Sequence, residues 1–218
     1  MEIRRIEQGD RNYPPLLVDR LAGAVPQALY SLGDPGILQN RLLGLICSIQ
    51  CPGSIVIKTF DVIRRLRDQL VVMIGGFHSP MERECLDLLL RGSQPVILCP
   101  ARSLRNLRMG KAARKALADG RLLALSCFGD EVRRTTSAQA LLRNDVVAGL
   151  AHTIFVPHAS PGGKTWATIR KAFERGQKVF SLEDEANTDL LASGAGTRLS
   201  NSLDGLIRKT GPVKTHTG

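Results

Sequence analysis

Six mostly apolar runs of strand length, separated by helical segments, constrain the fold of this chain more than any other feature. They cover residues 42–47, 70–74, 95–99, 122–126, 153–156 and 178–182. A strand that is apolar at every position is buried on both faces, whereas a half-exposed strand alternates between apolar and polar residues. We therefore expect an α/β fold of the doubly wound, Rossmann-like kind, with a mostly parallel sheet of six or more strands and helices on both faces.

Helical spacing fills the gaps between these runs, at residues 55–66, 80–91, 137–150 and 165–175. Ser79, Pro80 and Glu82 predict a capping box at the start of the second of these helices. Before residue 40 the chain shows a turn into a helical segment after Tyr13 and Pro14, and a short strand at residues 28–32. We expect an N-terminal extension packing on the core (residues 1–40), a Rossmann-like domain (41–209) and a flexible tail (210–218).

The formal net charge is +10 and the isoelectric point is about 9.9. Such a balance favours polyanionic partners, either nucleic acid or phosphorylated small molecules, although many proteins are simply basic. Aromatic residues make up only 4% of the chain, which argues against extensive base stacking but not against binding to a phosphate backbone.

The chain has no apolar stretch long enough to span a membrane and its start lacks the layout of a signal peptide. Its five cysteines are scattered, and Cys47 and Cys51 form a C-x₃-C pair without a second pair or a histidine at zinc-finger spacing. We expect a reduced cytoplasmic protein with no structural metal and no cofactor.

The turn after the run at 153–156 is the strongest candidate for a binding site. It carries Ser160, Gly162, Gly163, Lys164 and Thr165 just before a predicted helix. Free N–H groups of a first helical turn attract anions, Lys164 adds a positive charge, and Ser160 or Thr165 is placed to cap the helix or bond a phosphate oxygen. We predict an anion site here, most simply for phosphate.

This turn is not a P-loop, because the motif G-x-x-x-x-G-K-[ST] requires glycine where the chain has His158. Only one predicted strand follows the turn, and no predicted strand ends in an aspartate that would hold Mg²⁺. These departures argue against an ATPase.

Two earlier strand-to-helix turns are weaker candidates. Gly75 and Gly76 allow a ligand to approach a strand end, and His78 follows them, although such a histidine often serves only as a hydrogen-bonding loop residue. In the first turn, Ser48 is a polar candidate for the same ligand and Ser54 a helix cap, but no base is evident for Cys47 or Cys51 as nucleophiles.

Basic residues concentrate between positions 102 and 115. If this segment is helical, the steps of three place Arg102, Arg105 and Arg108 along one side, with only Asp119 nearby to offset them. They then form either a track for DNA phosphates or an ordinary solvated helix face.

Several motifs together resemble the DprA/Smf family. Residues 143–151, RNDVVAGLA, precede a strand, a Gly/Ser turn with threonine, and the sequence GQKVF at 176–180. The family shows R-N-R, two hydrophobic residues, A-G-L, a strand, S-G-S-x-x-T-A and then G-R-x-V-x-A. Similar lead-in and closing motifs extend the resemblance over residues 13–195. It implies an extended Rossmann fold, usually dimeric and without catalysis, that binds single-stranded DNA and passes it to RecA in natural transformation.

Carried over by position, Arg143 and Asn144 match the R-N of the family and join the predicted DNA-binding residues. The chain departs from the family where G-S-R is replaced by Cys47-Ser48-Ile49 and where the second arginine of R-N-R is Asp145. A nucleotide sensor or nucleotide-processing enzyme is therefore an alternative, because the turn also echoes P-G-G-x-G-T of the related LOG-like superfamily. A third possibility is an interaction module that has lost both ligands.

Overall fold

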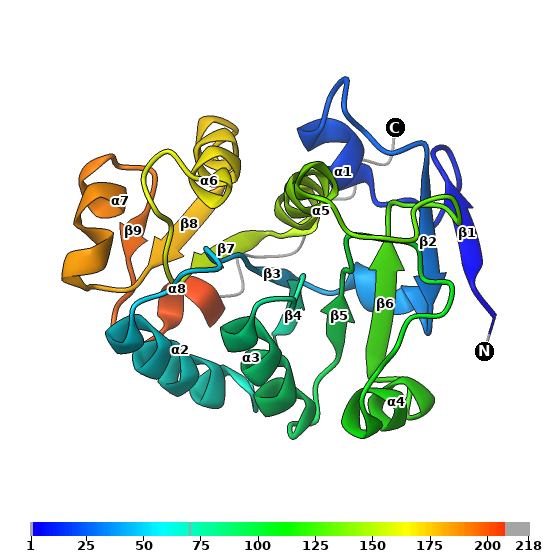
Figure 1. Ribbon diagram of the computed structural model, residues 1–218, viewed down its shortest axis with the longest axis horizontal. Coiled ribbons are helices and arrows are strands. Elements are labelled where there is room, and N and C mark those ends of the chain that lie inside the picture. Colours follow the sequence, from blue (N-terminus) through cyan, green and yellow to red (C-terminus); the bar gives the residue numbers. More distant parts are fainter. Residues whose placement is uncertain (1, 70, 208–218) are drawn as a thin grey trace.

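The computed structural model describes residues 2–69 and 71–207, which form one mixed sheet between two helical layers (Figure 1). The strands are β1 (Arg4–Glu7), β2 (Ala28–Leu32), β3 (Leu42–Leu45), β4 (Val72–Gly75), β5 (Val96–Leu98), β6 (Leu122–Ser126), β7 (Thr153–Val156), β8 (Lys178–Ser181) and β9 (Thr197–Arg198). The helices are α1 (Pro15–Arg20), α2 (Gly53–Leu66), α3 (Pro80–Leu90), α4 (Lys111–Ala118), α5 (Ser137–Leu150), α6 (Lys164–Glu174), α7 (Thr188–Ala192) and α8 (Asp204–Ile207), with 3₁₀ turns η1 (Pro35–Gln39) and η2 (Glu185–Asn187).

The strand order is β1-β2-β6-β5-β4-β3-β7-β8-β9. Strands β3 to β9 pair in parallel, whereas β2 pairs antiparallel to both β1 and β6. From β3 the chain moves outward through β4, β5 and β6 and then returns to β7 on the other side of β3. The gap between β3 and β7 is therefore the topological switch point, where ligands of such sheets bind beyond the carboxyl ends of the strands.

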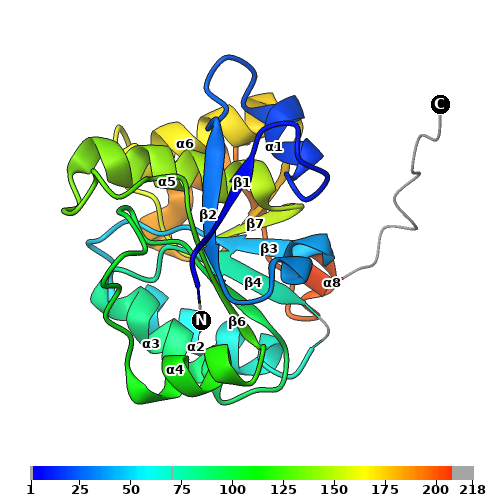
Figure 2. The ribbon, with the colours of Figure 1, turned by 90° about the vertical axis from the view of Figure 1, so that its right-hand side faces the viewer.

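Two hydrophobic clusters cover the two faces of the sheet. Helices α1, α5 and α6 cover one face, and α2, α3, α4 and α8 cover the other (Figures 1 and 2). Their buried side chains belong to the two clusters. Every residue of β3, β4, β6 and β7 is buried. This burial confirms the reading of mostly apolar runs as strands covered on both faces, and it confirms the Rossmann-like α/β expectation.

The N-terminal residues extend the sheet. Strand β2 adds to the edge of β6, β1 adds to β2, and α1 packs against α5. The proposed division at residue 40 stays a prediction, and the predicted tail at 210–218 lies outside the described residues.

The condition of a helix across Arg102, Arg105 and Arg108 is not met. Residues 99–110 form a loop, and α4 begins only at Lys111. Two local features favour the loop over a helix: the Ser103 hydroxyl accepts the Arg105 N–H at 3.0 Å, and Asn106 adopts a left-handed φ of 56°.

Candidate functional site

The turns that follow β3 and β7 pack together at the switch point. The Ser48 N–H donates to the carbonyl of His158 at 3.0 Å, and the Ser160 N–H donates to the Ser48 hydroxyl at 3.2 Å. The structure thus brings together Ser48 and the predicted anion turn, which are more than a hundred positions apart in the sequence.

Backbone geometry in the anion turn leaves the start of α6 open to a ligand. Gly162 has a φ of 70°, a left-handed conformation that favours glycine, and the Gly163 N–H closes the turn on the Ser160 carbonyl at 3.0 Å. The N-cap is Gly163, and no side chain caps the helix, so the expectation that Ser160 or Thr165 caps it is wrong. Thr165 is buried, whereas Lys164 is exposed. The uncapped N–H groups at the start of α6 and the Lys164 ammonium are the positively polarised groups of this turn, and its anion site stays a prediction.

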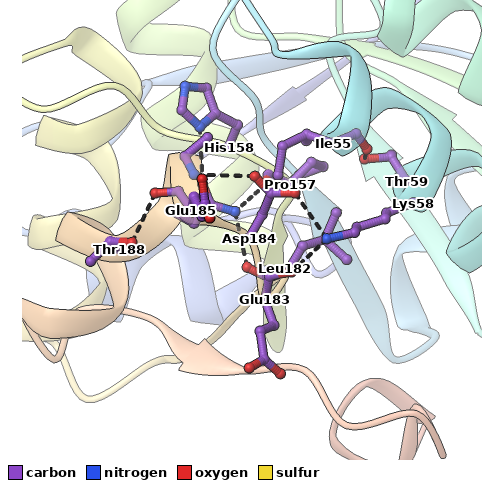
Figure 3. A network of polar contacts seen from close by, with 12 residues as sticks. Ile55, Lys58, Thr59, Pro157, His158, Leu182, Glu183, Asp184, Glu185 and Thr188 are labelled. Atoms are coloured by element: carbon purple, nitrogen blue, oxygen red, sulfur yellow. Dashed lines mark hydrogen bonds and ion pairs between the residues drawn. The ribbon is translucent and has the colours of Figure 1, made fainter.

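Pro157 and His158 of the same turn are labelled in Figure 3, and a buried asparagine on η2, Asn187, holds them in place. Asn187 donates to the carbonyls of Pro157 at 2.8 Å and Leu182 at 3.0 Å, so its amide oxygen is left to accept from His158 Nδ1 at 2.9 Å. A neutral His158 then presents Nε2 as an acceptor to the Ser160 hydroxyl at 3.3 Å. The amide of Asn187 thus fixes the orientation and tautomer of the His158 ring, and it supplies no negative charge to stabilise an imidazolium.

Figure 3 also shows Lys58 of α2 reaching across to the segment after β8. Its ammonium donates to the Glu183 carbonyl at 2.8 Å and lies 2.9 Å from the Asp184 carboxylate. The hydrogen bond that Lys58 donates to the Asp184 carboxylate, together with the one from the Ala186 N–H, lowers the pKa of Asp184. Ser54 also bonds Asp184 and does not cap α2, whose N-cap is Pro52, so the predicted cap is wrong.

The second turn is built on a buried arginine. Arg143 is 2% exposed and donates to the Cys99 carbonyl at 3.0 Å, and its Nη2 lies 3.1 Å from His78 Nδ1. A Cβ atom added to Gly76 would lie 1.3 Å from Arg143 Nη1, so glycine is required for the guanidinium to fit. Arg143 therefore supports the turn from inside and presents no surface to a ligand, while the partly exposed His78 does.

Glu82 completes this cluster and the predicted capping box. Its carboxylate accepts from the Ser79 N–H at 3.1 Å and lies 3.0 Å from His78 Nδ1, while the Glu82 N–H donates to the Ser79 hydroxyl at 3.3 Å. Burial raises the pKa of Glu82, but the hydrogen bond from His78, the charges of His78 and Arg143, and the Ser79 N–H outweigh it, so the net pKa is lowered. The carboxylate is therefore held ionised in the core.

Replacing Glu82 with glutamine is expected to lower the free energy of unfolding by about 1.5–3 kcal/mol at pH 7, the range for hydrogen bonds to charged groups. A carboxylate with a lowered folded-state pKa stabilises the protein above its unfolded-state pKa, and this contribution disappears as the pH falls through the folded-state value. The free energies of unfolding of the wild type and the variant, measured by urea unfolding, should thus converge at acid pH. A difference that persists unchanged at acid pH would contradict this.

The basic loop at 99–110 borders a groove of about 800 Å³ between α3 and α4, at the carboxyl ends of β4 and β5. Its basic lining residues are His78, Arg83, Arg91, Arg102, Arg108 and Lys111, against one carboxylate, Asp87. Arg105 instead pairs with Asp130 at 3.2 Å, a partner that sequence reasoning missed because it lies after β6. Arg102 and Arg108 therefore share a basic groove, although not through a helix.

Asn144 lies on α5, half-buried, and its side-chain amide has no hydrogen-bond partner in the part of the chain that the structure describes. Sequence reasoning missed Asn187, Arg83 and Arg91. Nothing in the sequence near Asn187 marks it as a partner of His158, but Arg83 and Arg91 follow a predicted strand-end turn, and a helical projection of 80–91 would have found them.

Among residues 2–69 and 71–207, no cluster of three or more side chains suits a metal ion, and no helix is long and apolar enough to cross a membrane.

One family model matches this chain, and two solved structures share its fold. The family described as DNA recombination-mediator protein A matches residues 4–206. DNA processing protein A (DprA) of Streptococcus pneumoniae superposes with a TM-score of 0.77 at 19% identity, covering 94% of this chain and 74% of that one. DNA processing protein A of Helicobacter pylori, whose structure concerns its single-stranded DNA binding mode, gives the same TM-score and identity and covers 94% of each chain. No curated protein sequence matches.

Proposed function

The chain belongs to the DNA recombination-mediator protein A family, and from this premise we propose that it binds single-stranded DNA through the phosphate backbone, without catalysis. The observation that carries the proposal is the uncapped start of α6 beside Lys164 at the switch point of a strongly basic protein. Helix N-termini with a neighbouring lysine bind phosphate oxygens without reading base identity.

The groove on the neighbouring strands supplies further phosphate contacts in this proposal. Strands β3, β4, β5 and β7 run parallel, so the anion turn, the Gly76 turn and the loop at 99–110 all lie at the carboxyl edge of the sheet. A single DNA strand that runs along this edge of the sheet would contact Lys164 and then Arg102 and Arg108. Phosphate contacts suit a chain with few aromatic residues to stack on bases.

Binding of a fluorescently labelled oligo(dT), measured by anisotropy at several salt concentrations, tests the proposal. Log affinity should fall linearly with log salt, and replacing Lys164 or Arg108 with alanine should each reduce the slope by about 0.7, because each removes one phosphate contact. Lys178→Ala is the matched control, since Lys178 is exposed at the amino end of β8. Absence of binding at low salt, or affinity that is indifferent to salt, would refute the proposal.

A phosphorylated small molecule is the second candidate, because the turn after β7 is intact while Ile49 stands where the family places an arginine. A panel of nucleoside phosphates should then raise the melting temperature, as any ligand specific to the folded state must. If DNA raises the melting temperature and no nucleotide does, the small-molecule function is refuted. If neither ligand binds, the interaction module remains.

The proposal includes a homodimer and transfer of DNA to RecA in the cytoplasm, as the family resemblance implies. Sedimentation of the purified protein with and without oligo(dT) tests the dimer. Loading of RecA onto coated DNA tests the transfer.

A further inference from the structure

Two cysteines flank the first turn of the carboxyl edge. Cys47 directly follows β3 and is 4% exposed, and Cys51 comes two residues before the start of α2. Their thiols are hydrogen-bonded to each other. Cys51 also lines an open, largely apolar groove of about 510 Å³ with Ile49, Phe60 and Met81. One thiol of the pair thus faces a groove that small solutes enter, and the other lies behind it.

The two thiols differ in acidity. The hydrogen bond from Cys47 lowers the pKa of Cys51, although burial and Asp184 oppose this shift. The same bond and burial raise the pKa of Cys47. The remaining cysteines are also less acidic than Cys51, because burial raises the pKa of Cys85, Cys99 and Cys127 to about 12 each. A reactive cysteine is accessible, readily ionised and next to a resolving thiol, and of these five Cys51 fits that description.

We propose that Cys47 and Cys51 form a redox modification site that hydrogen peroxide converts to an intramolecular disulfide. The Cys51 thiolate attacks one peroxide oxygen, the O–O bond breaks, and hydroxide leaves with a sulfenic acid on Cys51. Cys47 sulfur then attacks Cys51 sulfur, the S–O bond breaks, and the departing hydroxide takes the Cys47 proton to form water. The two thiols are oxidised by two electrons and one peroxide is reduced to two waters.

The modification encloses Ser48 in the ring between the two sulfurs, and Ser48 is the residue that bonds the anion turn. The site itself stands apart from the proposed DNA binding, because its chemistry needs only the two thiols and the open groove.

Peptide mapping of the full chain after peroxide treatment tests this proposal. The tryptic peptide 42–58 holds both thiols, whereas Cys85, Cys99 and Cys127 fall in other peptides. Treatment followed by iodoacetamide should give this peptide two hydrogens lighter and without alkyl groups, and dithiothreitol should restore both alkylation sites. The Cys47→Ser variant should stop at a sulfenic acid on Cys51, trapped by dimedone, and Cys51→Ser should lose the reaction.

Cys127→Ser is the matched control and should oxidise at 42–58 like the wild type. Full alkylation of the wild-type peptide after peroxide would overturn the proposal, as would a disulfide that joins Cys51 to Cys85 or to a second chain. These outcomes are measured on the wild-type protein, so the test stays decisive even if a cysteine variant fails to fold.

Discussion

Replacing Gly76 with alanine is expected to lower the free energy of unfolding by about 3–5 kcal/mol, the cost of disrupting a buried charged group and its partner. The new methyl group would lie 1.3 Å from Arg143 Nη1 and 2.0 Å from its Cζ, so the guanidinium has to leave its position. Arg143 is long enough to move, but it then loses its bond to the Cys99 carbonyl and leaves Glu82 without its charge. Urea unfolding monitored by circular dichroism measures the loss.

A double-mutant cycle separates this steric conflict from a general intolerance of alanine. In an Arg143→Ala background the same change at Gly76 should cost less than about 1 kcal/mol, because the clashing group is gone. Gly53→Ala is the matched control: its Cβ would meet nothing within 4 Å, and its stability should stay within about 0.5 kcal/mol. Equal costs at Gly76 in both backgrounds would show that Arg143 is not the obstacle.

The sheet could be predicted from the sequence because its central strands are buried on both faces. Their apolar runs admit no other reading once helices alternate with them, and the predicted bounds differ from those observed by only a residue or two. Strand β1 could not be found this way. It reads Arg-Arg-Ile-Glu, with only Ile6 buried, so its composition does not indicate a strand. The strand forms because it pairs antiparallel with β2.

Local chemistry predicted the candidate site only where one segment carries the information. Gly162 and the box at Ser79 and Glu82 were found because a turn or a helix start dictates its own residues. Arg143 was assigned to DNA because the motif places it there, and its burial depends on Gly76 and Cys99 from two other strand ends. Contacts between distant segments have no local signature, so Asp130 beside Arg105 was also missed.

Asn187 was missed for the same reason, because its partners lie in distant segments of the chain. Removing its side chain is the second change with a large expected effect. Asn187→Ala should lower the free energy of unfolding by about 3–5 kcal/mol, because the carbonyls of Pro157 and Leu182 lose their buried donor and a cavity remains. Urea unfolding measures this loss. Asn201→Ala, at an exposed position, is the control and should change stability by less than about 0.5 kcal/mol.

DNA affinity distinguishes a positioning role of Asn187 from a purely structural one. Without Asn187 the His158 ring loses the bond that fixes its tautomer, and the Ser160 hydroxyl loses its acceptor. Affinity for oligo(dT), measured where both proteins are folded, should then fall about fivefold, the equivalent of one hydrogen bond. His158→Ala should cause the same loss of affinity with a smaller loss of stability, because Asn187 keeps both of its donated bonds. If affinity survives both changes, Ser160 takes no part in binding, and only Lys164 and the backbone of α6 hold the phosphate.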